Sequence, residues 1–101
     1  MKKPIQTKKE RRLAQFFKAL GNEWRLLIVE LLVEEPRSVT ELADSLDKSQ
    51  NFISGHLKLL KLVGILKYES VGKFRKYSLN KDKIREILDA AHAEFFRLPP
   101  R

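Results

Sequence analysis

The sequence contains no cysteine and no apolar run of about 18 residues. The first absence excludes disulfides, thiolate metal sites and cysteine nucleophiles. The second argues against a membrane-spanning helix, and the basic N-terminal residues are followed by no apolar signal region, so we expect a cytoplasmic protein. With 101 residues, the chain is predicted to form one small domain, to which a dimer interface could add buried surface.

Sequence patterns typical of enzymes are also missing. There is no Gly-x-Ser-x-Gly sequence, no phosphate-binding loop and no regular spacing of metal ligands. A chain of this length also leaves little room for an enclosed substrate pocket. We therefore expect neither an enzyme nor a bound cofactor or metal.

Positive charge is unevenly distributed along the chain, whose net charge is +8. Residues 1–12 hold six Lys/Arg against one acid, and residues 48–76 hold seven against one. Residues 13–47, in contrast, hold three Lys/Arg against seven acids. Such segregation favours a nucleic-acid partner over a general role of charge in solubility.

Residues 49–63 predict an amphipathic helix with an unusual polar face. Ile53, Leu57 and Leu60 recur at the spacing of a buried helical stripe. The opposite face carries amides, a hydroxyl, a glycine and two lysines, without a single acid. Amides can form two hydrogen bonds with an adenine edge, so the first turns suit the major groove of DNA. The alternative is an ordinary solvated face, although such faces usually mix both signs of charge.

A short helix precedes this one and forms a helix-turn-helix with it. Ser38 and Glu41 have the spacing of a capping box, after which Leu42 and Leu46 face inward. Asp47 and Lys48 leave only a tight connection to the next helix. The second helix, with its polar first turns and basic flank, is the predicted recognition helix.

After Gly64 the periodicity changes from that of a helix to that of a strand. Residues 65–70 and 74–79 predict two strands joined by the short loop 71–73, which form a wing. Its basic residues are well placed to reach phosphates or a minor groove beside the recognition helix. Alternatively, lysines protect an edge strand from aggregation.

Three further helices complete the predicted domain. The first carries Leu13, Phe16, Phe17 and Leu20 and ends at Gly21, and its two phenylalanines suit a second subunit or the core of the monomer equally well. The second is capped by Asn22 and runs to Glu34, with a core-facing stripe. The last is predicted to be capped by Asn80 and to run over residues 81–96. Its apolar stripe either packs against a twofold mate or folds back on its own domain. That stripe contains Ile84, Ile87, Leu88, Ala91 and Phe95.

The predicted fold is therefore mainly α with a β-hairpin wing, a winged helix-turn-helix. We expect a flexible basic arm over residues 1–9, a single domain over residues 10–97 and a tail over residues 98–101.

Four segments in this order resemble the ArsR/SmtB family of bacterial and archaeal repressors. Residues 17–28 resemble its opening ALGDPTRLRIL pattern, and residues 40–43 its ELA helix. Residues 53–60 resemble its S-x-HL-x-x-L recognition helix, and residues 72–79 its GR…YxL wing. The resemblance covers residues 13–96, nearly the whole chain.

The resemblance implies a homodimer that is joined by its first and last helices and represses transcription by blocking promoter DNA. The interface residues expected from this likeness and from the apolar stripes are Leu13, Phe16, Phe17, Ile84, Ile87, Leu88, Ala91 and Phe95. The expected contacts to double-stranded DNA are Ser49, Gln50, Asn51, Ser54, His56, Lys58, Lys73, Arg75 and Lys76. Whether His56 touches DNA or packs beneath the helix is left open by the sequence.

The chain departs from the family where many members bind metals. The stretch that follows the ELA pattern has no thiol, and the last helix offers only Asp89 and His92, with no second histidine downstream. One imidazole and one carboxylate per chain are a thin ligand set for a four-coordinate ion. The effector is therefore unknown. The alternatives to a sequence-specific regulator are a non-specific architectural or RNA-binding winged helix and a protein-interaction module.

Overall fold

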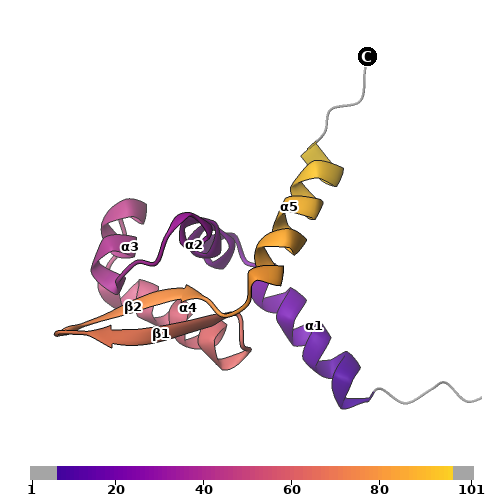
Figure 1. The fold of residues 1–101 in the computed structure, drawn as a ribbon, viewed down its shortest axis with the longest axis horizontal. Helices are drawn as coiled ribbons and strands as arrows, with labels where there is room; N and C mark the ends of the chain where they lie inside the picture. The colour runs from indigo at the N-terminus through magenta and orange to yellow at the C-terminus, as the bar shows by residue number, and fades with distance from the viewer. Residues whose placement is uncertain (1–6, 97–101) are drawn as a thin grey trace, which may run out of the picture.

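The computed structural model describes residues 7–96 and confirms the predicted order of elements (Figure 1). Five helices and a two-stranded antiparallel hairpin, which lies along one side of the helices, form a winged helix-turn-helix. In chain order the elements are α1 (Lys8–Leu20), α2 (Glu23–Glu34), α3 (Val39–Leu46), α4 (Gln50–Leu62), β1 (Leu66–Val71), β2 (Phe74–Leu79) and α5 (Asp82–Phe96).

Side-chain caps fix where the first helices begin. Thr7 forms a capping box with Glu10, so α1 begins at Lys8 and takes up two residues that we had assigned to the flexible arm. The rest of that arm, residues 1–6, and the predicted tail lie outside the described residues. Asn22 caps α2 as predicted, and Ser38 caps α3 in a capping box with Glu41.

The core is built around α4 and α2. Ile53, Leu57 and Leu60 of α4 are at most 1% exposed, which confirms the stripe expected on the recognition helix. From α2, Ile28, Val29 and Leu32 are buried. The residues predicted to form the apolar stripe of this helix included Leu27, which is 39% exposed, whereas Val29, outside that stripe, is fully buried.

The wing is a hairpin with a two-residue turn. Its register pairs Leu66 with Leu79 at the base and Val71 with Phe74 at the tip, where Gly72 adopts a left-handed φ of 62°. The other edge of β2 is also paired, because the backbone of Arg37 exchanges two hydrogen bonds with Tyr77. The loop between α2 and α3 thereby anchors the wing to the helix-turn-helix.

The start of α5 differs from the prediction. Asn80 does not cap this helix, which begins at Asp82. Its side-chain amide instead donates a hydrogen bond to the carbonyl of Gly64, over 3.0 Å, and its backbone N–H donates to Ile65. Asn80 therefore ties the two ends of the hairpin together, a role that requires knowing which residues the fold brings side by side.

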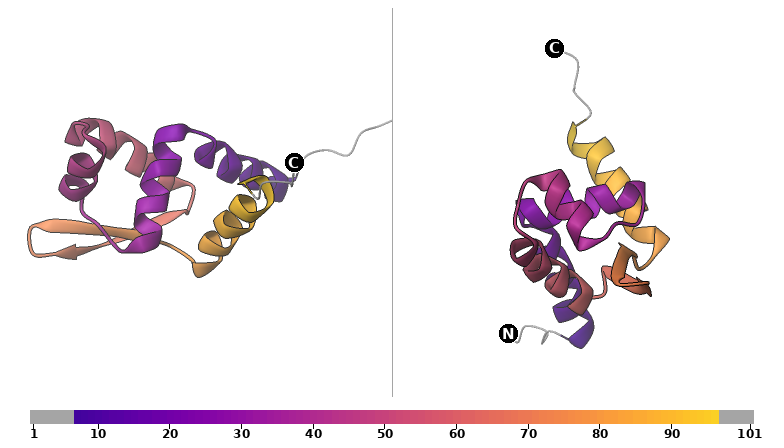
Figure 2. Two further views of the ribbon diagram at one scale, coloured as in Figure 1. Left: turned by 90° about the horizontal axis from the view of Figure 1, so that it is seen from above. Right: turned by 90° about the vertical axis from the view of Figure 1, so that its left-hand side faces the viewer.

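The outer helices lie together at one end of the molecule. In Figure 1, α1 and α5 extend from the side opposite the wing tip, and the view from above in Figure 2 shows the same separation. The wing and the two terminal helices are thus free to meet different partners. Within residues 7–96, no helix is both long and apolar enough to cross a membrane.

Candidate nucleic-acid interface

The polar face of α4 is open to solvent. Asn51, Ser54, Gly55 and Lys58 recur at the spacing of one helical face, and all four are exposed. Gln50 is exposed at the first turn. A Cβ atom added at Gly55 would meet nothing within 4 Å, so the packing of the protein itself does not require a glycine there.

The turn into α4 holds this face in place. Asp47 ends α3 in a left-handed conformation, with φ 55°. Ser49 then caps α4, because its hydroxyl accepts a hydrogen bond from the N–H of Phe52 over 3.0 Å. The ammonium of Lys48 lies 4.6 Å from the ring centroid of Trp24, which secures the same turn from the side of α2. The hydroxyl of Ser49 therefore has a structural role in addition to the DNA contact expected of it.

His56 faces the protein and not the open side of α4. Its ring packs edge-on against Phe52, and its Nδ1 lies 3.4 Å from a guanidinium nitrogen of Arg25. Arg25 also donates a hydrogen bond to the carbonyl of Ala19, near the end of α1. Burial lowers the pKa of His56 below its usual value, and the nearby Arg25 lowers this pKa further. His56 thus joins α4 to α2 and, through Arg25, to α1.

Acidification should destabilise the fold through His56. A base whose pKa is lowered by folding binds protons more readily when unfolded, so stability is retained above the ordinary histidine pKa and lost as pH falls through it. We expect the urea midpoint to fall between about pH 7.5 and about pH 5.5, and to fall less in His56→Gln.

The matched control for this pH effect is His92→Gln, at the other of the two histidines. This substitution should not reduce the acid-induced fall. If the urea midpoint fell equally in the wild type and in His56→Gln on acidification, the loss of stability could not be assigned to His56.

The two faces of the wing have different neighbours. Because side chains alternate along a strand, Tyr68, Arg75 and Tyr77 share the face that lies against α4. Lys73 lies at the exposed tip. Lys76 is on the opposite face, where its ammonium lies 3.2 Å from a carboxylate oxygen of Glu41.

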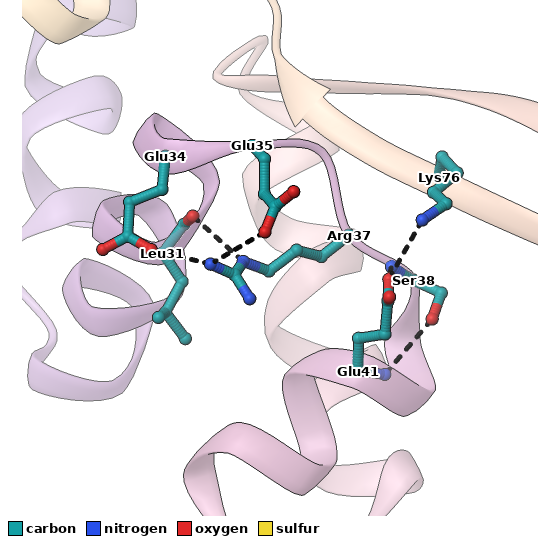
Figure 3. A network of polar contacts seen from close by, with 7 residues as sticks. All are labelled: Leu31, Glu34, Glu35, Arg37, Ser38, Glu41 and Lys76. Atoms are coloured by element: carbon teal, nitrogen blue, oxygen red, sulfur yellow. Dashed lines mark hydrogen bonds and ion pairs between the residues drawn. The ribbon is translucent and has the colours of Figure 1, made fainter.

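A polar network joins the wing to the helix-turn-helix (Figure 3). Glu41 accepts hydrogen bonds from the N–H of Ser38 and from Lys76, and these two contacts lower its pKa. Arg37 donates to the carbonyl of Leu31 and to Glu34 at the end of α2. Lys76, expected to contact DNA, therefore has part of its charge engaged within the protein.

A groove of about 360 Å³ separates α4 from the wing, and three of its lining residues, Lys61, Tyr68 and Tyr77, are not among the DNA contacts expected from the sequence. Lys61 lies about one turn beyond Lys58, the last α4 residue expected to contact DNA. Strand alternation could have placed Tyr68 beside Arg75, although not beside Lys61. The groove is lined by Ser54, Lys58, Lys61, Tyr68, Arg75 and Tyr77.

The residues expected at a dimer interface differ in how far they are buried within the protomer. Ile84 and Leu88 are 5% and 8% exposed, so they belong to the core of the protomer and leave little surface for a partner. Phe16 is half-buried. The others are exposed on α1 and α5, and among them Phe17 is 55% and Phe95 81% exposed. The exposed members are Leu13, Phe17, Ile87, Ala91 and Phe95.

His92 contacts a carboxylate that the sequence did not single out. Its Nε2 lies 2.5 Å from Glu30, and this contact joins α5 to α2. Over the described residues, no group of three or more His, Cys, Asp or Glu side chains is close enough to hold a metal ion.

Comparison with known proteins gives consistent matches to one class of regulator. The family described as "Bacterial regulatory protein, arsR family" matches residues 22–68. An uncharacterized HTH-type transcriptional regulator of Methanocaldococcus jannaschii, MJ1325, is 38% identical over 81 residues, which are 79% of this chain and 91% of that protein. These matches are to regulators and not to enzymes, as expected.

Solved structures agree with this assignment. The crystal structure of Rv0081 from Mycobacterium tuberculosis matches with a TM-score of 0.83 and 31% identity, over 91% of this chain and 93% of that one. The transcriptional repressor BigR from Xylella fastidiosa matches with a TM-score of 0.76 and 30% identity, over 87% of this chain and 90% of that one.

Proposed function

The chain belongs to the arsR family of DNA-binding transcriptional regulators, and we propose that it acts as a homodimeric repressor at an inverted-repeat operator. The observation that carries the proposal is the exposed face of α4, which bears amides, a hydroxyl, a glycine and lysine, with no acid. Such a face can hydrogen-bond base edges while it attracts the phosphate backbone. The similarity to BigR, which is a transcriptional repressor, supports repression as the outcome of binding.

Residues of α4 and of the wing have separate roles in this proposal. Gln50, Asn51 and Ser54 read base edges in the major groove, and Lys58 contacts a phosphate beside them. Arg75 contacts the DNA backbone beside α4, and Lys73 at the wing tip contacts the backbone further along the duplex. His56 supports α4 from the protein side, and Lys76 chiefly orients the wing through Glu41.

Dimerisation is proposed to occur through the exposed apolar side chains of α1 and α5. They lie at the end of the molecule opposite the wing tip, so a twofold mate can bind there without covering α4 (Figure 1). A twofold dimer presents two copies of α4, which would reach half-sites about 34–36 Å apart, one turn of DNA.

The experiment that tests this function is selection of duplex DNA from a random pool, followed by fluorescence anisotropy on the selected sequence at several salt concentrations. An enriched inverted repeat with half-sites about one helical turn apart is the expected result. Salt-sensitive binding without any enriched sequence would contradict sequence-specific repression and would favour an architectural or RNA-directed role.

Gly55→Ala should raise stability while it weakens DNA binding. Alanine is favoured over glycine in a helix by about 0.5–1 kcal/mol, and the protein has open space at this position. A methyl group on the exposed face of α4 would, however, hold the backbone away from the DNA. We expect a higher urea midpoint together with a lower affinity for the selected duplex. A gain in stability with unchanged affinity would show that α4 does not approach DNA at Gly55.

Lys73→Ala should weaken binding to every duplex DNA by the same factor, whatever its sequence. Lys73 is exposed at the wing tip, where it can neutralise a phosphate without touching a base. Loss of one phosphate contact should lower the slope of log K against log salt by about 1. Anisotropy titrations on selected and random duplexes measure both quantities, and a loss confined to the selected sequence would mean that Lys73 reads bases.

A further inference from the structure

The groove between α4 and the wing concentrates positive charge from two elements that are distant in sequence. Lys58 and Lys61 come from the helix and Arg75 from β2, and none of the residues lining the groove is acidic. The nearest acid along β1 is Glu69, which pairs across the strands with Lys76 on the other face of the wing. The groove therefore carries positive charge without an acidic residue in its lining.

Tyr68 lies between the two sources of this charge. Its ring centroid is 4.4 Å from the guanidinium carbon of Arg75 and 5.3 Å from the ammonium of Lys61. Both distances are within the range of a cation–π contact. A single aromatic ring thus holds a cation of the recognition helix and a cation of the wing close together before any ligand binds.

The same ring is poorly placed to stack on a nucleic-acid base. Tyr68 is half-buried, and its ring centroid lies 5.4 Å from that of Tyr77. The ring contacts Tyr77, Lys61 and Arg75, and the two cationic side chains line the groove beside it. These contacts favour the capture of an anion over the stacking of an unpaired base.

We propose that Tyr68 is a positioning residue that holds Lys61 and Arg75 around one phosphate of the DNA backbone, at the junction of α4 and the wing. This inference rests on the proposed function, since it requires that the chain bind duplex DNA. Long cationic side chains lose rotamer freedom when they bind, and cations that are already held in place lose less. One phosphate gripped from both sides would also fix the register of the wing relative to α4.

The test compares Tyr68→Leu, which removes the ring, with Tyr68→Phe, which retains it. Neither substitution changes the net charge. We expect Tyr68→Leu to weaken binding to a random duplex about two- to tenfold, whereas Tyr68→Phe should bind as the wild type does. Urea unfolding of both variants shows whether a loss of affinity reflects a loss of fold.

A second background separates positioning from a direct contact. In a Lys61→Gln, Arg75→Gln chain, Tyr68→Leu should have no further effect on affinity, because no cations remain to be positioned. An equal loss in both backgrounds would overturn the inference and assign the ring a direct or purely structural role.

If Tyr68→Leu does not fold, the salt dependence of DNA binding by Lys61→Gln, Arg75→Gln and the double variant tests the proposal instead. Their combined loss of salt slope should be smaller than the sum of the single losses if one phosphate is shared, and full additivity would overturn the proposal.

Failure of the inference can be distinguished from failure of the proposed function. A wild-type chain that shows no salt-dependent binding to duplex DNA would refute the function and the inference together. Normal salt-dependent binding that is unchanged by Tyr68→Leu would refute the positioning role alone.

Discussion

Ala91→Glu is expected to sediment as a monomer near 11.8 kDa, under conditions in which the wild type sediments at about twice that mass. Ala91 is exposed on α5, beside an apolar hollow that is shared with Phe95 and Phe96. A carboxylate at this position would be buried without a partner when two copies associate, so the free energy of dimerisation should become unfavourable. Because two linked half-sites bind with avidity, operator affinity should fall about 10²–10⁴-fold while binding to a single half-site persists.

Ala93→Glu provides the matched control. It introduces the same side chain on the same helix, about 200° further around the axis and away from the apolar stripe. This variant should remain dimeric and bind the operator normally. Phe17→Glu tests the other terminal helix, since Phe17 is 55% exposed on α1. A monomeric wild type, or an Ala91→Glu variant that remains dimeric, would exclude the proposed interface.

The fold could be predicted because its signals are local. The apolar stripe of α4 follows directly from residue spacing, and the caps of α2 and α3 follow from short side-chain patterns. The change to strand periodicity after Gly64 likewise predicts the wing. The exposed face of α4 is also predictable, because it is the complement of the buried stripe. Thr7 and Glu10 carry a local signal too, and their capping box was missed among the basic residues.

The features that the sequence could not predict are contacts between elements that are distant along the chain. Amphipathic spacing shows that Ile84 and Leu88 lie on an apolar face, but it does not show whether the protomer or a mate covers them. The charge of Lys76 gives no indication of its partner Glu41, 35 residues away. His56 lies on α4, the proposed recognition helix, but its ring is directed toward Arg25 within the protein. In each case tertiary packing decides a role that local pattern leaves open.

Gln50→Ala and Asn51→Ala should each cost about 1–3 kcal/mol on the selected operator, roughly a 5- to 150-fold loss of affinity. Both amides are exposed in the first turn of α4, which the Ser49 cap holds in a fixed direction. An amide that forms two hydrogen bonds with an adenine edge discriminates among bases and adds little to the attraction for phosphates. On a random duplex, affinity and salt slope should therefore remain near their wild-type values.

A matched control exchanges another glutamine for alanine. Gln15 is exposed on α1 and lines a hollow with Leu59, Leu62 and Val63 at the far end of α4, so Gln15→Ala should leave operator affinity unchanged. Repeated selection with Gln50→Ala and Asn51→Ala should also yield operators with relaxed preference at one or two positions in each half-site. If both variants lost affinity equally on selected and random DNA, the amides would be acting as backbone contacts. The reading of bases would then have to be assigned to other residues of α4.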